Sequence, residues 1–463
     1  MSKAELEARH LADLHVLAAE AGVPRFRLLR RDELIEELLV RGADVGADEA
    51  EAPAAEALEE AEVAPEVEED EEEEERPPRR SRPSRRRRRG RAEAAEEKAE
   101  EPSEPPPPEG EVEDEATETV SGVLDVVPSG HGFLRLSGLG PGSGDVYISA
   151  SQIRRCELRA GDEVSGPSRQ PRRGERHPAL VHVETINGAE AGEERGTSFE
   201  ELTPVAPHRR LPLQLESDDL LTRAVDLLCP LAFGQRVLVL AQPRSGRTAL
   251  LRGVARALTA AAEPPALLVL LVDERPEEVT EWRRQFPAAE IAAASADLES
   301  RDQIRLAELG LARAKRRAET GADVVVLVDS LTRLGVAYRD ASEVKPFFGA
   351  GRELEEEGAG SLTVIATVLT DIQDGEGALE AVATTENATA ALDAELAAAG
   401  VVPAIDSGRC AVSGEEALRS EDELAAVRRL RDELRVRDKA GAAELLAERL
   451  RDSATNAELL ASV

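Results

Sequence analysis

Continuous apolar runs recur along residues 200–463. Val237–Leu240, Ala266–Val272 and Val324–Val328 contain no polar residue, and segments with helical spacing lie between them. An uninterrupted run rich in valine and leucine is typical of a parallel strand that is buried on both faces. We therefore predict an α/β domain with a parallel sheet over residues 200–463.

Residues 120–190 show a different pattern, in which short apolar segments alternate with glycine and proline. The segments are Val123–Val127, Gly132–Leu136, Asp145–Ile148 and Ala179–Val183. Short strands separated by turn-forming residues predict a small β-barrel of the OB type.

The amino-terminal segment, residues 1–42, has apolar residues at helical spacing. Leu11, Leu14 and Ala18 share one helical face. This spacing predicts a small helical module.

Residues 43–119 contain few apolar side chains. An acidic run (68–75), a basic run (85–89) and a proline run (105–108) follow one another there. Such a composition cannot bury enough surface to offset its ordering entropy, so we predict a disordered linker. The basic run is either a non-specific contact for RNA phosphates or is neutralised by the flanking acids.

The chain as a whole is strongly acidic, but the charge is unevenly distributed. Asp and Glu number 93 against 58 Lys and Arg, which gives a formal net charge of −35. Taken globally, this charge disfavours a polyanionic partner. Between residues 120 and 188, however, eight arginines stand against seven acids, a balance of +1. The predicted barrel is therefore compatible with RNA.

Cysteine usage and hydropathy exclude several classes of protein. Cys156, Cys229 and Cys410 are far apart and form no Cys-x-x-Cys pair, so neither disulfides nor a zinc site is predicted. No run approaches the roughly 18 to 20 apolar residues of a membrane span, and the amino terminus is charged. We expect a cytoplasmic protein without a membrane partner.

A candidate phosphate-binding loop lies between the strand-like run Val237–Leu240 and the helix-like segment 249–255. The intervening residues 241–248 read AQPRSGRT. A phosphate site needs backbone amides at a helix N-terminus, a glycine for the tight turn, a cation and a hydroxyl for magnesium. The glycine, arginine and threonine supply the last three, although an ordinary strand-to-helix turn is the alternative. The predicted nucleotide-binding residues of this loop are Pro243, Arg244, Ser245, Gly246, Arg247, Thr248 and Ala249.

Acidic residues follow the two neighbouring predicted strands. Val324–Val328 runs into Asp329, as a strand that holds magnesium through a water requires. Ala266–Val272 runs into Asp273 and Glu274, at the carboxyl end of the sheet where open α/β folds bind ligands. One of these acids would polarise an attacking water. The alternative is that they are solvated loop residues.

Longer strings of residues carry a resemblance to a known family. The strings are Asp273–Glu281, Asp329–Leu334, Phe347–Ala350, Gly360–Thr367 and Pro403–Asp406, with Tyr147–Arg155 and Leu158–Asp162 upstream. On these strings the chain resembles the bacterial transcription termination factor Rho, a ring-shaped RNA-dependent ATPase, over about residues 120–463 and the first forty. The resemblance implies a RecA-like P-loop ATPase domain preceded by an OB-fold, cold-shock-like barrel, with six copies in a ring.

The resemblance also implies roles for individual residues. Glu274 would activate water with Arg275 beside it, the loop would bind ATP, and Thr248 and Asp329 would bind Mg²⁺. Val402 stands where the family has an aromatic residue that packs on adenine. The implied RNA-binding residues are His131, Phe133, Arg135 and Tyr147, with His131 replacing an aromatic ring of the family. The implied partners are single-stranded RNA and RNA polymerase in the transcription complex, with assembly as a homohexamer or together with another Rho.

Several positions depart from the family pattern. Arg247 replaces the phosphate-binding lysine, and a planar guanidinium cannot take the place of a compact ammonium without moving the phosphates or itself. Ser413 stands where the family has an arginine that reaches a neighbouring subunit's nucleotide, with Arg409 four residues earlier. Only residues 339–346 remain of a longer RNA-gripping loop, and residues 389–400, basic in the family, carry negative charge. Two hypotheses follow: a working RNA-dependent ATPase that terminates transcription, or a catalytically impaired paralogue that binds RNA or co-assembles with another Rho.

The end of the chain also shows helical spacing. The apolar positions are Leu430, Leu434, Leu445, Leu446 and Leu450. We predict that helices around residues 421–450 pack on the sheet.

Overall fold

The computed structural model describes residues 118–193, 196–211, 213 and 215–463. They belong to one compact unit that spans Pro105–Val463. The predicted helical module (1–42) and the predicted linker up to residue 117 lie outside the described residues.

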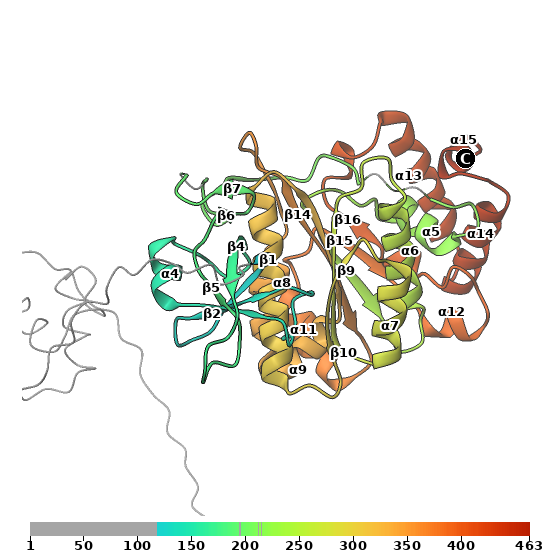
Figure 1. The fold of residues 1–463 in the computed structure, drawn as a ribbon. Coiled ribbons are helices and arrows are strands. Elements are labelled where there is room, and N and C mark those ends of the chain that lie inside the picture. The colour runs from blue at the N-terminus through green and yellow to red at the C-terminus, as the bar shows by residue number, and fades with distance from the viewer. Residues whose placement is uncertain (1–117, 194–195, 212, 214) are drawn as a thin grey trace, which may run out of the picture. The chain divides into compact units, whose positions relative to one another are not determined.

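The first described residues form a β-barrel (Figure 1). Its strands are β1 (Glu118–Val126), β2 (Gly132–Arg135), β3 (Val146–Ile148), β4 (Glu163–Arg169), β5 (Ala179–Leu180), β6 (Thr185–Ile186) and β7 (Ala189–Glu190). The order is β1-β2-β3-β5-β4, and β4 pairs back onto β1, which closes the barrel. The predicted barrel is therefore confirmed. Strand β4 escaped prediction because its sequence, EVSGPSR, has no apolar run.

Alternation of side chains along these strands builds the interior of the barrel. Leu124 of β1 and Leu134 of β2 are fully buried and face each other across the strand pair. Helix α4 (Ala150–Arg155) follows β3 and begins at a capping box, in which the side chains of Ser149 and Gln152 each accept a hydrogen bond from the other's backbone amide. Gln152 also donates to carbonyls next to β5, so the helix is fixed to the barrel.

The rest of the described chain is built on a twisted sheet. Its strands are β8 (Pro204–Val205), β9 (Arg236–Ala241), β10 (Ala266–Glu274), β11 (Glu290–Ser295), β12 (Asp323–Asp329), β13 (Arg352–Leu354), β14 (Ser361–Leu369), β15 (Ala388–Ala391) and β16 (Ala411–Val412). The order is β11-β10-β12-β14-β9-β15-β16, and every pair from β11 to β15 is parallel. The predicted α/β fold with a parallel sheet is confirmed.

Helices cover both faces of this sheet (Figure 1). Because side chains alternate along a strand, Val237 and Val239 of β9 enter one apolar core, whereas Leu238 and Leu240 enter the other. The first core is covered by α5 (Leu220–Leu228), α6 (Arg247–Thr259), α7 (Pro276–Gln285), α13 (Glu421–Arg435), α14 (Lys439–Arg451) and α15 (Asn456–Ala461). The second core is covered by α8 (Ser300–Glu319), α9 (Leu331–Tyr338), α10 (Val344–Phe348) and α11 (Gln373–Val382). None of the helices among the described residues is both long and apolar enough to cross a membrane.

The carboxyl-terminal helices pack on the sheet as predicted. The predicted leucines Leu430, Leu434, Leu446 and Leu450 are buried in the first core, and Leu445 packs against it. A buried arginine also ties these helices to α5. Arg223, which is 1% exposed, donates to the carbonyl oxygens of Leu450 and Ser453.

Helix α8 carries the contacts between the barrel and the α/β part. Arg159 of the barrel donates to Glu319 at the end of α8, at 2.8 Å. A Cβ on Gly161, whose φ is +84°, would lie 2.4 Å from the carbonyl carbon of Ala312 on α8. Glycine at this position is therefore what allows the barrel loop to approach the helix backbone so closely.

Residues 389–400, which carry negative charge where the family is basic, contribute a strand to the central sheet and the helix after it. Residues 388–391 form the buried strand β15 of the central sheet, between β9 and β16. Helix α12 (Ala394–Ala398) follows, and both Asp393 and Glu395 pair with Lys439 of α14, at 2.7 and 2.8 Å. An effect of this negative charge on RNA stays a prediction. The shortened connection 339–346 forms the 3-10 turn η2 (Ala341–Glu343) and the start of α10.

Candidate nucleotide and RNA sites

The candidate phosphate loop connects β9 to α6 at the carboxyl edge of the sheet. Gly246 immediately precedes α6 with φ +99°, a left-handed conformation that favours glycine, and Arg244 has φ +66°. No side chain caps α6, so its first amides remain available to a ligand. The hydroxyl of Ser245 is buried without a hydrogen-bond partner. A helix N-terminus with free amides fits an anionic ligand such as a phosphate.

Arg247, the first residue of α6, turns toward two carboxylates at the ends of neighbouring strands. Its Nε lies 3.0 Å from Oδ1 of Asp329, which ends β12. Its Nη2 lies 3.4 Å from Oε2 of Glu274, which ends β10. The Arg247 side chain is 14% exposed and therefore lies mostly within the site. The three predicted residues thus come together.

The two carboxylates are both buried, and each has further partners. Asp329 is 2% exposed and accepts a hydrogen bond from Thr367 of β14, at 3.1 Å. Glu274 is 7% exposed and accepts a hydrogen bond from Arg333 of α9, at 2.8 Å. Burial raises the pKa of Asp329 above its ordinary value, and the positive charge of Arg247 opposes that rise.

A bulge in β10 directs Glu274 into the site. The pairing of β10 with β11 shifts register between Val272 and Glu274, and Asp273 has φ +53°. The carbonyl of Asp273 accepts a hydrogen bond from Arg333 at 2.7 Å, which holds the bulge against α9. Our sequence analysis did not single out Arg333. Its position four residues after Asp329, in the first turn of the next helix, was the available signal.

Other predicted nucleotide residues lie nearby or at the surface. Thr248 is half-buried in the first turn of α6, and Pro243, Arg244 and Ala249 are exposed. Arg275 is exposed before α7, and its backbone amide donates to Glu274 at 3.2 Å.

Two further predicted positions follow α12: Val402, where the family has an aromatic residue against adenine, and Ser413, where it has an arginine that reaches a neighbouring subunit's nucleotide. Val402 is 52% exposed. A side chain that packs on a base is exposed in this way before the ligand binds. Ser413 and Arg409 are exposed as well. A role for these residues toward a nucleotide stays a prediction.

A role for Thr248 and Asp329 in holding Mg²⁺ stays a prediction. The carboxylate of Asp329 already contacts the Arg247 guanidinium and the Thr367 hydroxyl. Both contacts are made by Oδ1, so a cation that ligated this atom would require Arg247 to turn away from it.

Three predicted RNA-binding residues form an aromatic cluster on the barrel. Phe133 of β2 and Tyr147 of β3 are cross-strand partners, with ring centroids 6.0 Å apart. His131 lies 5.3 Å from Tyr147 and 5.8 Å from Phe133. His177, which the sequence analysis missed, lies 5.1 Å from Phe133 on the other side.

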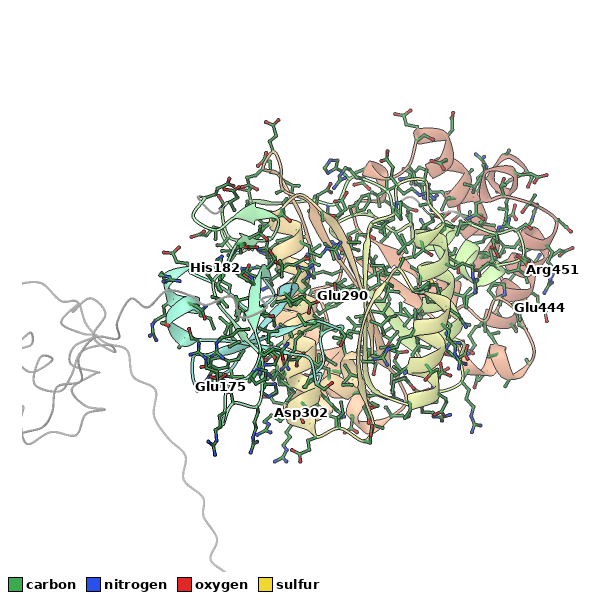
Figure 2. All side chains as sticks on the ribbon, viewed as in Figure 1. Glu175, His182, Glu290, Asp302, Glu444 and Arg451 are labelled. Carbon is green, nitrogen blue, oxygen red and sulfur yellow. The ribbon has the colours of Figure 1, made fainter. Side chains whose placement is uncertain are left out.

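A pocket of about 660 Å³ opens beside this cluster. Its lining includes Phe133, Tyr147 and His177 together with basic side chains and Glu175, which Figure 2 labels on the barrel. A hydrogen bond from Arg169 lowers the pKa of Glu175 to about 2. The pocket therefore combines ring faces with arginines, the combination that single-strand binders use for bases and phosphates.

Arg135 lies beside the cluster, on the face of β2 opposite the interior Leu134, and is buried by its ion pairs. Its guanidinium is 6% exposed, pairs with Asp125 and Asp145, and lies 5.6 Å from the ring of Phe133. These ion pairs hold β1, β2 and the start of β3 together. A contact between Arg135 and RNA stays a prediction.

These features define a class of protein: a P-loop α/β nucleotide-binding fold that carries an OB-type barrel with an aromatic pocket. Residues 120–192 match the family model of the Rho termination factor RNA-binding domain. Residues 222–346 match that of the ATP synthase alpha/beta family nucleotide-binding domain.

Curated relatives belong to the same family as the first of these two models. Transcription termination factor Rho of Bacillus subtilis is 39% identical over 372 residues, which cover 76% of this chain and 86% of that protein. Rho of Streptomyces lividans is 39% identical over 374 residues, which cover 76% of this chain and 52% of that protein. The chain belongs to the transcription termination factor Rho family, as its resemblance predicted. It spans about half the length of the Streptomyces relative.

A solved structure of an ATPase from the type III secretion system of pathogenic bacteria is also similar. It is 19% identical, with a TM-score of 0.46, and the match covers 61% of this chain and 93% of that chain.

Proposed function

We propose that this chain is a Rho-type transcription termination factor that binds single-stranded RNA and couples ATP binding and hydrolysis to RNA translocation and transcript release. The observation that carries the proposal is the presence, in one compact unit, of a pocket lined by aromatic rings and arginines and of a candidate phosphate loop near two buried acids. Helix α8 links the two regions through its ion pairs with the barrel.

The barrel recognises RNA by stacking and charge. Bases stack on the faces of Phe133, Tyr147 and His177, because every base has a π-face that an aromatic ring can contact. Arg155 and Arg176, which also line the pocket, neutralise phosphates. RNA affinity therefore falls as the salt concentration rises.

The loop before α6 binds the phosphates of ATP through its backbone amides. Glu274 is the carboxylate that orients the attacking water, and its release from Arg247 and Arg333 has to precede that step. The adenine lies against the exposed Val402, where an aliphatic side chain replaces an aromatic stack. The chain works as a ring of six copies or in a mixed ring with another Rho, and it acts on the transcribing RNA polymerase.

A second candidate function is that of a catalytically impaired paralogue that binds RNA or regulates another Rho. The contact of Arg247 with Asp329 favours it, because the cation expected at the phosphates is held by the acids instead. The serine at 413 favours it too, since no guanidinium stands at that position to stabilise transition-state charge.

The test is ATP hydrolysis by the purified full chain, with and without cytidine-rich RNA. A Glu274→Ala variant controls for a contaminating ATPase. RNA-stimulated turnover that disappears in the variant supports the motor. RNA binding without turnover in the wild-type chain supports the impaired paralogue.

A further inference from the structure

Two histidines flank Phe133 in the aromatic cluster of the barrel. The ring centroid of His131 lies 5.8 Å from that of Phe133, and the centroid of His177 lies 5.1 Å from it. His131 also lies 5.3 Å from Tyr147, and His177 lines the pocket itself. The chain has six histidines, so two of the six stand at the surface proposed to hold RNA.

Histidine gives this surface a property that phenylalanine and tyrosine lack, because its charge ordinarily changes between about pH 5 and pH 8. A neutral imidazole ring stacks on a base as the other rings do. An imidazolium ring stacks as well, and it also attracts the RNA phosphates and the π-face of a base. RNA therefore binds the charged form of these histidines more tightly than the neutral form.

The hydrogen bonding of the two rings permits both charge states. Nδ1 of His131 lies 3.1 Å from the hydroxyl oxygen of Ser129. A hydroxyl accepts a hydrogen bond from the protonated ring and donates one to the neutral ring, so this contact survives protonation. Nδ1 of His177 is buried and has no hydrogen-bond partner in the part of the chain that the structure describes. No group in that part of the chain therefore holds His177 in one charge state through this atom.

Fixed charges around the pocket oppose protonation of the histidines until RNA binds. The charged side chains of the lining are Arg155 of α4, Arg169 of β4, and Glu175 and Arg176 of the turn before β5. Those next to Phe133 are Arg135, its partners Asp125 and Asp145, and Arg305 of α8, which pairs with Asp125. The second group is neutral as a whole, whereas the lining has three guanidiniums and one carboxylate. This net positive charge disfavours a further cation, and the RNA phosphates remove that penalty.

The fixed charges of the lining do not themselves change in the range where histidine titrates. A hydrogen bond from Arg169 lowers the pKa of Glu175 to about 2, so this carboxylate stays ionised. Arginine stays charged as well. A pH effect on RNA binding between about pH 5 and pH 8 is therefore expected from the histidines of the cluster.

We propose that RNA binding by the barrel takes up protons on His131 and His177, so that RNA affinity rises as the pH falls from about 8 to about 5.5. The linkage is reciprocal: RNA favours the protonated rings, and protonation favours RNA by the same factor. The inference rests on the RNA binding proposed above. It extends that proposal by naming a regulation of the same site.

The experiment measures RNA affinity by fluorescence anisotropy with the full chain and a labelled oligouridine at fixed salt, at about pH 5.5 and about pH 8. Uracil is uncharged at both values, so the change of pH acts on the protein. For the wild-type chain we expect a dissociation constant at least about fivefold smaller at the lower pH. The double variant His131→Phe with His177→Phe keeps both rings but takes up no proton there, so its two dissociation constants should agree within about twofold.

His182→Phe is the matched control. His182, which Figure 2 labels, lies on the barrel outside the lining of the pocket, and its side chain is 55% exposed. This variant should keep the wild-type dependence on pH. Circular dichroism at both pH values checks that each variant is folded. The single variants His131→Phe and His177→Phe should each lose part of the dependence.

Each result separates the inference from the function on which it rests. A wild-type change smaller than about fivefold would overturn the inference and leave RNA binding intact. A folded double variant that keeps the wild-type dependence would overturn the role of the two histidines. No binding of RNA by the wild type at either pH, with ATP still bound in a parallel calorimetric titration, would overturn the inference together with the proposed RNA function.

Discussion

Arg305 on α8 donates a hydrogen bond from its Nε to Oδ1 of Asp125 on β1, 3.1 Å away. The same carboxylate accepts from Nε of Arg135, at 3.0 Å, so one buried acid serves a guanidinium of the barrel and one of the α/β part. Asp125 is 4% exposed. Arg135 in turn lies beside the ring of Phe133. The aromatic pocket and α8 are thus joined through the side chains of Arg135 and Asp125.

This arrangement predicts a large cost for Asp125→Ala. The substitution leaves Arg135 buried with one carboxylate fewer and removes the partner of Arg305, and breaking a buried pair in this way costs about 3–5 kcal/mol. Urea unfolding followed by circular dichroism measures the free energy of unfolding. The control is Asp302→Asn, an acid with a 45% exposed side chain in the first turn of α8 that Figure 2 labels, for which we expect a loss below about 1 kcal/mol. Equal stabilities for the two variants would contradict the role of Asp125.

Substitutions of Tyr147 test whether the aromatic cluster of the barrel binds RNA. Tyr147→Ala removes a ring that faces both His131 and Phe133, and loss of one stacked base weakens binding by about 1–3 kcal/mol. Tyr147→Phe keeps the ring and should keep most of the affinity. Fluorescence anisotropy with a labelled single-stranded RNA at fixed salt measures both variants. An unchanged dissociation constant for the alanine variant would remove Tyr147 from the site.

The sequence predicted the parts of the nucleotide site that depend on strand order alone. Asp329 and Glu274 follow apolar runs, and because these runs become adjacent parallel strands, their ends meet at one edge of the sheet. What the sequence did not predict is which side chain contacts which. The pairing of Arg247 with both acids depends on the rotamer of Arg247 and on the bulge at Asp273, neither of which apolar periodicity reports.

In the barrel, too, some site residues could be predicted from the sequence and others could not. Phe133 and Tyr147 were predictable, because alternation along two short strands places them on one surface. His177 was missed since it lies on the far side of a glycine-containing turn, in a segment without strand-like pattern. Arg135 was predicted at the RNA surface, yet ion pairs with two buried acids keep its side chain buried, and such pairs form only once the strands have packed.

The lowered pKa of Glu175 predicts that the stability of the fold depends on pH. Its pKa is lowered from 4.5 to about 2, mainly by the hydrogen bond from Arg169, so the folded state binds a proton less readily than the unfolded state. The stabilisation is therefore complete above about pH 4.5 and is lost as the pH falls through about 2. Glu175→Gln should lower the thermal midpoint at neutral pH, and the difference from the wild type should shrink on acidification. A difference that is constant from neutral pH to about pH 2 would contradict this assignment.

Arg223 tests the attachment of the carboxyl-terminal helices. Its guanidinium donates to the carbonyls of Leu450 and Ser453, where α14 ends, and to the side chain of Asn456 at the start of α15. Arg223→Leu leaves these buried acceptors without a donor, so we expect a loss of about 1–3 kcal/mol in the free energy of unfolding. Arg428→Leu, an exposed arginine on α13, should change that free energy by less than about 0.5 kcal/mol. Urea unfolding compares the two variants, and limited proteolysis locates the effect. If α14 and α15 are held by Arg223, the first cleavages in Arg223→Leu fall within residues 439–461, and cleavage elsewhere would mean that the apolar contacts of Leu446 and Leu450 hold these helices without it.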